Sequence, residues 1–131
     1  MNKLIINADD FGYKKEINQG IIEAHSFGTV TSTTIMTNEK EFDHALSLYQ
    51  KSLGIGIHLN LTWGNSLLTG KPFHKWNKYK AALGIINKDF VEKEFQKQIE
   101  KLLEVGIRPD HLDSHQHLHA FQPLTDIMIK L

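Results

Sequence analysis

The feature that most constrains the fold is an alternation of short strand-like runs with segments of helical periodicity. Residues 3–8 form a continuous apolar run, which is typical of a strand buried on both faces. Residues 29–37 are rich in β-branched side chains, and residues 54–62 alternate apolar with polar side chains. A fourth predicted strand leads into the histidine-rich segment 111–119.

Helical patterns separate these strands. Ile17, Ile21 and Ala24 share one helical face, and Gly28 follows as a glycine at a helix C-terminus would. Residues 41–51 repeat the helical spacing. Strands that alternate with helices predict an α/β fold with a mainly parallel sheet.

A long loop and two further helices complete the pattern. The loop spans 63–79 and carries two tryptophans, and loops of this length in a compact domain are more often functional than idle. Asn87 can cap a helix over 89–105, and Pro123 fits the first turn of a last helix.

The number of these units predicts part of a larger architecture. We expect residues 1–131 to form a single domain with about four βα units. A parallel (β/α) barrel needs about eight such units, so the chain is expected to correspond to the N-terminal half of a barrel-like fold. A sheet with open edges could associate with a second copy, and we expect a homodimer.

Composition excludes several classes of function. The 15 Lys and Arg residues balance 15 Asp and Glu residues, so no nucleic-acid or membrane partner is expected. The chain has no cysteine, which excludes disulfides, thiolate metal sites and cysteine nucleophiles. No segment approaches the roughly twenty apolar residues of a membrane helix. We therefore expect a cytoplasmic protein with a small or neutral ligand.

Acidic and histidine side chains follow separate predicted strands at their C-terminal ends. Asp9 and Asp10 end the first strand, His58 lies late in the third, and His115, His117 and His119 lie at or after the end of the fourth. In parallel α/β folds these strand ends meet at one edge of the sheet, where ligands bind. The side chains are therefore expected to converge.

A carboxylate and two imidazoles from three strands make a ligand set suited to a divalent metal with bound water. A second carboxylate beside it could accept a proton from that water, which would give metal-assisted hydrolysis. Adjacent residues at a strand end point in different directions, so Asp10 can bind the metal while Asp9 faces the substrate.

Each element also has an ordinary structural interpretation. The Asp9–Asp10 pair could belong to a turn that caps the next helix, and His58 could be a hydrogen-bonded strand histidine. The segment 111–119 could be an exposed run that binds metals adventitiously. The shared location of these residues at one sheet edge favours a site, because unrelated residues would be scattered over both edges.

Three segments resemble the signature blocks of the YdjC-like carbohydrate deacetylases, a family that includes chitooligosaccharide deacetylases. They are NADDFG at 7–12, GIHLNLT at 56–62 and DSHQHLH at 113–119, and the LTGKP loop at 68–72 also matches. The blocks occur in the family's order and cover nearly the whole chain. Three blocks together are a strong signal, although each alone would be weak.

The resemblance implies a distorted (β/α) barrel that removes the N-acetyl group from an N-acetylglucosamine unit of a small oligosaccharide. It implies one divalent metal ion, Mg²⁺ or Zn²⁺, with Asp10, His58 and His115 as ligands and Asp9 as the general base. The family's later strands, which complete the barrel and supply further pocket residues, lie beyond the blocks matched here.

Four other residues are expected to support the metal ligands or to contact substrate: Asn60, Trp63, His117 and His119. His119 could instead be a ligand if it shares a helical face with His115. Trp63 directly follows the third strand, so its ring is a better candidate for stacking on a sugar than that of Trp76.

Two rival functions remain open from the sequence. One is a different metal-dependent barrel enzyme, such as a sugar isomerase or phosphoesterase, because acids and histidines at strand ends serve many reactions. An isomerase would more naturally carry glutamates and a lysine around two metals. The other is a carbohydrate-binding protein that lacks turnover.

Overall fold

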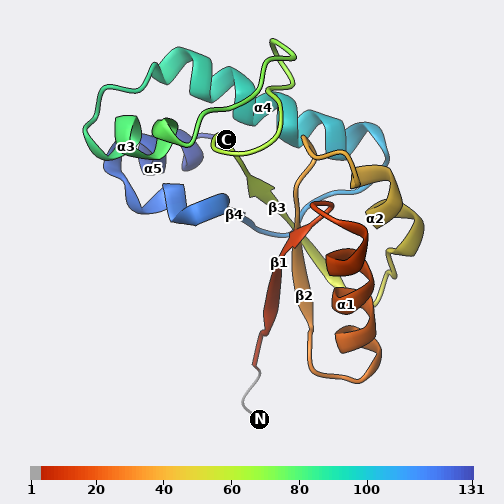
Figure 1. Cartoon of the computed structure of the whole chain (residues 1–131). Helices are drawn as coiled ribbons and strands as arrows, with labels where there is room; N and C mark the ends of the chain where they lie inside the picture. The colour runs from red at the N-terminus through yellow and green to blue at the C-terminus, as the bar shows by residue number, and fades with distance from the viewer. Residues whose placement is uncertain (1–3) are drawn as a thin grey trace.

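The computed structural model describes residues 4–131 and contains one parallel sheet (Figure 1). Its strands occur in chain order, β1-β2-β3-β4, and each neighbouring pair is parallel. The strands are β1 (Asn7–Phe11), β2 (Ser32–Ile35), β3 (Gly54–Leu59) and β4 (Leu112–Ser114). The predicted α/β fold is confirmed, and a strand order that follows the chain is consistent with part of a barrel.

The helices occupy the connections between strands. They are α1 (Lys15–Ser26), α2 (Phe42–Leu48), α3 (Trp76–Ala82), α4 (Lys88–Glu104) and α5 (Gln122–Met128), with a 3₁₀ segment η1 (His115–Ala120) directly after β4. The Asn87 side chain caps α4 by accepting a hydrogen bond from the Phe90 amide at 3.0 Å. Pro123 lies in the first turn of α5. Both predictions from the sequence are confirmed.

The first strand begins later than predicted. The apolar run was expected to pair from residue 3; Lys3 lies outside the described residues, and Leu4 and Ile5 are each 77% exposed rather than buried. β1 has a neighbouring strand on one side only, so the apolar run before it has little to pack against. Asp9 and Asp10 lie near the C-terminal end of β1, as predicted.

The loop predicted over 63–79 is also shorter than expected, because α3 begins at Trp76. Its first part is anchored to α4 through a buried carboxylate. Glu94 accepts hydrogen bonds from the Ser66 hydroxyl at 2.7 Å and from the amides of Leu67 and Leu68. This buried acid fixes the loop that follows β3.

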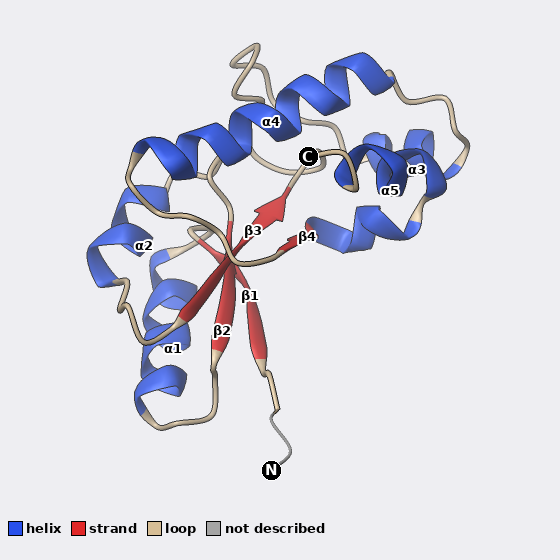
Figure 2. Ribbon diagram, turned by 180° about the vertical axis from the view of Figure 1, so that it is seen from behind, coloured by secondary structure: helices blue, strands red, loops and turns tan. Residues whose placement is uncertain are grey.

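The two faces of the sheet differ in chemistry. One face carries Ile35, Ile57 and Leu59, which are buried in the hydrophobic core together with residues of the surrounding helices. Figure 2 shows α1 and α2 beside this sheet and α4 crossing near the C-terminal ends of the strands. We call this apolar face the outer face.

The opposite face, here called the inner face, carries polar side chains from every strand. Thr34 of β2 lies between Asp9 of β1 and His58 of β3, and His58 is paired in register with Asp113 of β4. Since side chains alternate along a strand, the same four strands supply both the core and this polar row.

Among residues 4–131, none of the helices combines the length and the apolar character needed to cross a bilayer.

Candidate metal site

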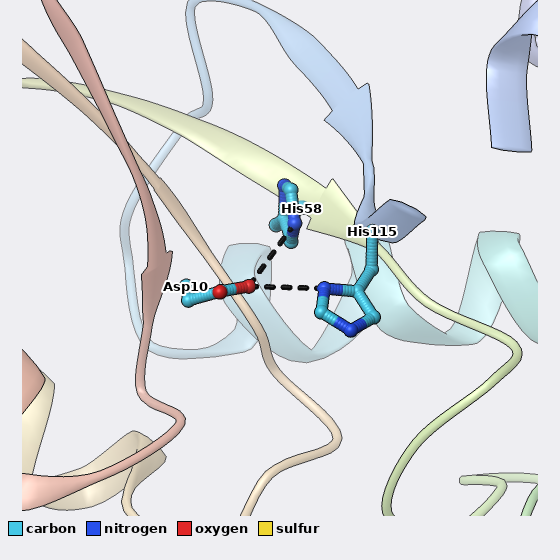
Figure 3. A group of neighbouring side chains, drawn as sticks. All are labelled: Asp10, His58 and His115. Atoms are coloured by element: carbon cyan, nitrogen blue, oxygen red, sulfur yellow. Dashed lines mark hydrogen bonds and ion pairs between the residues drawn. The ribbon is translucent and has the colours of Figure 1, made fainter. Parts of the chain in front are cut away.

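Three side chains predicted to bind a metal meet at the C-terminal ends of the strands (Figure 3). Asp10 comes from β1, His58 from β3, and His115 from the first position after β4. The Asp10 Oδ1 atom lies 3.3 Å from Nε2 of His58 and 3.0 Å from Nδ1 of His115. One ligand atom from each residue lies within 4.8 Å of the others. The predicted convergence is therefore confirmed for Asp10, His58 and His115, and it is wrong for His117 and His119.

An irregular backbone places Asp10 in this cluster. The register of β1 against β2 shifts between Ala8 and Phe11, and Asp10 has a left-handed φ of 66°. Aspartate tolerates this region better than most residues, but the conformation still costs free energy, on the order of 1 kcal/mol. Gly12 follows with a φ of 97°, and a Cβ there would lie 2.9 Å from the Met36 carbonyl oxygen. Such strain is concentrated at functional sites.

His115 is placed by a second irregular segment. Gln116 and His117 both have φ angles of 55°, so η1 does not form a regular helix after His115. The helical face that would bring His115 and His119 together is absent. Instead, Nδ1 of His119 lies 2.8 Å from the Ser114 hydroxyl. The structure does not bring His119 or the exposed His117 into the cluster.

His58 is almost fully buried between two carboxylates. Its side chain is 3% exposed, with Asp10 at Nε2 and Asp113 at Nδ1. Burial lowers the pKa of His58, but the hydrogen bonds and charges of Asp10 and Asp113 outweigh it and raise the pKa to about 9. In the same way, hydrogen bonds from His115 and His58 hold the pKa of Asp10 well below its usual range. The cluster is electrostatically coupled.

Asp9 points to the inner face beside this cluster. Its Oδ1 atom accepts a hydrogen bond from the Asn7 side-chain amide at 2.8 Å. Asp9, His58 and Asp113 form a second group of possible ligand atoms within 4.8 Å of one another. Both adjacent acids therefore lie beside His58. The expected divergence of neighbouring side chains is not seen, because the register shift and the left-handed φ of Asp10 bring its carboxylate to the same face as that of Asp9.

The residues present fit a divalent metal ion. One carboxylate oxygen and two imidazole nitrogens from three strands converge on one point, which is the donor set that Zn²⁺ and related ions bind while keeping positions for water. Magnesium prefers oxygen donors, so two imidazoles favour zinc or a transition metal over it.

The two residues predicted in the loop after β3 have different positions. Asn60 is fully buried, and its side chain bonds the backbone of Thr62 and Trp63 within the loop. Its amide therefore shapes the loop that follows β3. Trp63 is 50% exposed, and its ring packs edge-on against Tyr13 at 5.9 Å between centroids.

A buried acid that the sequence analysis did not single out lies near the cluster. Glu39, in the loop after β2, is 8% exposed, and its Oε1 atom has no hydrogen-bond partner among residues 4–131. A Cβ at Gly64 would lie 2.1 Å from that oxygen, so only glycine fits there. Burial raises the pKa of Glu39, the charge of His115 lowers it and that of Asp10 raises it further.

Three polar residues around the cluster also had no predicted role. Asp113 and Asn7 lie inside the blocks DSHQHLH and NADDFG, while Thr34 lies in a run of β-branched residues. The alternation of β3 and β4 could have placed Asp113 beside His58, but only with the strand register known. The register pairs these two residues directly.

Comparison with known proteins shows the family of this chain. Residues 3–131 match the sequence profile described as YdjC-like protein. The chain belongs to the YdjC-like protein family.

Curated relatives within this family carry related names. A carbohydrate deacetylase from Brevibacillus brevis is 39% identical over 136 residues, which is 98% of this chain and 55% of the relative. A chitooligosaccharide deacetylase from Proteus mirabilis is 37% identical, over 95% of this chain and 53% of the relative. The YdjC-like chain therefore spans about half the length of these relatives.

A solved structure supports the same fold. An Enterococcus faecalis protein, described as a candidate cellobiose-phosphate cleavage protein, superposes with a TM-score of 0.83 and 34% sequence identity. The superposition covers 96% of this chain and 53% of the other. The α/β fold of the YdjC-like chain thus agrees with that of a solved protein.

Proposed function

We propose that this chain forms the metal-binding part of a carbohydrate N-deacetylase, a hydrolase that breaks the amide C–N bond of an N-acetylated sugar. The observation that carries the proposal is the meeting of Asp10, His58 and His115 at one sheet edge with Asp9 beside them. The names of the curated relatives support the substrate class.

Asp10, His58 and His115 are the proposed ligands of one divalent ion, Zn²⁺ or Mg²⁺. When bound, such an ion supplies a Lewis acid that polarises the acetyl carbonyl and lowers the pKa of a water molecule. The protein's contribution is to hold Asp10 and His58 on strands and His115 at the first position after β4, so that the sheet largely sets their spacing.

Asp9 is the proposed general base. It is exposed on the inner face, so a water molecule and a substrate can reach it. Asn7 donates a hydrogen bond to Oδ1 of Asp9 at 2.8 Å, which orients the carboxylate and leaves its other oxygen free to accept a proton from water. The water oxygen then forms the new bond to the acetyl carbon, and the C–N bond breaks as the leaving nitrogen takes up the proton that Asp9 removed from the water, which gives acetate and an amine.

The proposed substrate is a small oligosaccharide that contains N-acetylglucosamine. Trp63 and Tyr13 come from the loops after β3 and β1 and pack together near the proposed metal site. Half of the Trp63 side chain is exposed, so its ring offers an apolar surface on which a sugar could stack.

We also propose that the sheet is one part of a (β/α) barrel and that the chain forms a homodimer. Parallel strands in chain order support the first point. The open edges of β1 and β4 and the exposed Leu4 and Ile5 support the second. Light scattering at micromolar concentration should give a dimer mass, and a monomer mass would count against it.

The test of the function is acetate release from chitobiose and chitotriose. The chain is stripped of metal, then assayed with added Zn²⁺ or Mg²⁺, alongside a version extended to the length of its relatives. Metal-dependent acetate from either version, lost in Asp9→Asn, is the expected result. The absence of acetate from both versions with every metal would overturn the proposal.

The Enterococcus faecalis neighbour gives a second candidate, because its description names the cleavage of cellobiose phosphate. Cellobiose phosphate belongs in the same assay, with glucose and glucose phosphate measured as the products of cleavage. Release of either product without acetate from chitobiose would favour that reaction over deacetylation.

A further inference from the structure

The proposed metal site contains an ambiguity that the geometry can resolve. Two groups of possible ligands share His58: one adds Asp10 and His115, and the other adds Asp9 and Asp113. The two groups involve different nitrogens of the His58 ring. Asp10 lies beside Nε2, and Asp113 lies beside Nδ1. Which nitrogen binds the metal decides which group is the site.

Asp113 and His58 are held together by the sheet. They are register partners in the parallel pair β3 and β4, and both side chains lie on the inner face. The Asp113 Oδ1 atom lies 2.6 Å from Nδ1 of His58. This short distance is typical of a charge-assisted hydrogen bond in which the ring N–H donates to the carboxylate.

The second oxygen of Asp113 is also engaged. The Thr34 hydroxyl donates a hydrogen bond to Oδ2 of Asp113 at 3.2 Å. Thr34 is fully buried, and its hydroxyl lies farther from Asp9, at 3.5 Å. With both oxygens already accepting protein hydrogen bonds, Asp113 is better suited to orienting the imidazole than to binding an ion.

We propose that Asp113 is a positioning residue: it accepts the Nδ1–H of His58, fixes the ring tautomer, and so presents Nε2 to a metal held with Asp10 and His115. This rests on the proposed metal site. A carboxylate behind a metal-binding histidine orients the ring and makes its other nitrogen a better donor, and its loss typically weakens metal binding by about 10- to 100-fold.

The chain offers a matched control. A carboxylate oxygen of Asp110 also contacts a histidine nitrogen, the Nδ1 atom of His111. That pair lies at the start of the same strand region, and neither residue belongs to either group of possible ligands. Asp110→Asn therefore removes the same charge from the same kind of pair without touching His58.

The first test is Zn²⁺ affinity by calorimetry on the full 131-residue chain. Asp113→Ala should bind Zn²⁺ about 10- to 100-fold more weakly. Asp113→Asn keeps an acceptor oxygen and should lose less than about tenfold, and Asp110→Asn should bind as the wild type does. Wild-type affinity in Asp113→Ala would overturn the proposal, as would equal losses in the Ala and Asn variants, because the latter indicates that Asp113 is itself a ligand.

The second test needs no variant. Nitrogen chemical shifts of His58 in the wild-type chain report which ring nitrogen carries hydrogen and which binds Zn²⁺. The proposal requires a protonated Nδ1 and a metal at Nε2; a metal at Nδ1 would refute it. Both readouts are independent of catalysis, so Zn²⁺ bound at Nε2 without acetate release would reject the deacetylase function and leave the role of Asp113 intact.

Discussion

The outer and inner faces of the sheet are built from the same four strands but have different roles. On the outer face Ile35, Ile57 and Leu59 are buried in the hydrophobic core. On the inner face Thr34 and His58 are joined to carboxylates by hydrogen bonds. Because side chains alternate along a strand, one register fixes both the packing of the core and the spacing of the polar groups.

This comparison teaches that the packing of the apolar core and the arrangement of the polar groups can be altered separately. Outer-face side chains contribute through buried apolar area, whereas inner-face side chains contribute through hydrogen bonds and charge. A substitution on the outer face should leave the spacing of the polar side chains largely unchanged. A substitution on the inner face should leave the packing of the apolar core largely unchanged. The predictions below test that separation.

The largest expected effect is on stability from the outer face. Ile35→Ala leaves a cavity beside the helices and should lower the free energy of unfolding by about 2–5 kcal/mol. Asp9→Asn, on the exposed part of the inner face, should change it by less than about 1 kcal/mol. Chemical denaturation measures both. A comparable loss in Asp9→Asn would show that the inner face is also part of the stabilising core.

The next effect is a pH dependence of the folding stability, which comes from His58 on the inner face. In the folded metal-free chain the pKa of His58 is about 9, against 6.5 in the unfolded chain. The protonated pair therefore stabilises the fold below pH 6.5, and this stabilisation, about 3 kcal/mol, is lost as the pH rises through 9.

Thermal unfolding with a chelator present should show this decline in the melting temperature between pH 6.5 and 9. His58→Gln should flatten it. A melting temperature that stays constant, or that rises, over this range in the wild type would contradict the assigned ion pairs.

A smaller effect is expected at the buried acid near the site. Glu39→Met removes a carboxyl oxygen that has no partner among the described residues and should raise stability at pH 7 by about 1–2 kcal/mol. Since burial raises the pKa of Glu39, its charged form destabilises the fold above the unfolded pKa of 4.5.

The gain from Glu39→Met should therefore shrink as the pH falls from the raised pKa of the folded state towards 4.5, and should be smallest below 4.5. Glu16→Met, at an exposed position of α1, is the matched control and should not stabilise the chain. An equal gain at both positions, or a loss at Glu39, would argue that the buried Glu39 carboxyl does not destabilise the fold.

The smallest effect concerns the aromatic side chains around the site. Trp63→Ala should raise KM for chitotriose about fivefold, which corresponds to about 1 kcal/mol of lost stacking. Trp76→Ala should raise it less than about twofold, because Trp76 packs on Tyr79 within α3 rather than beside β1. Steady-state kinetics on an active version gives both values, and a reversed order would remove Trp63 from the proposed sugar surface.

Much of this architecture could be predicted from the sequence because its signals are local. Apolar periodicity located α1, β2, β3 and α4, and the Asn87 cap marked the start of α4. The start of β1 was wrong because apolar residues normally indicate burial, whereas Leu4 and Ile5 are exposed.

The polar contacts around the site depend on tertiary structure, which local patterns do not encode. Asp113 could be placed beside His58 only through the β3–β4 register. Glu94 had a weak sequence signal, since it falls on the apolar stripe of α4 beside Phe95. The left-handed backbone of Asp10 and the break after His115 have no simple signal in the residue types.

The central claim is that the C-terminal ends of these parallel strands hold one divalent ion. Its most direct test is an anomalous-diffraction map of the chain crystallised with Zn²⁺. The account predicts one strong peak bound by Asp10, by Nε2 of His58 and by His115, with Asp113 hydrogen-bonded to Nδ1 of His58. A peak between Asp9, Nδ1 of His58 and Asp113, or no peak at this edge at all, would contradict it.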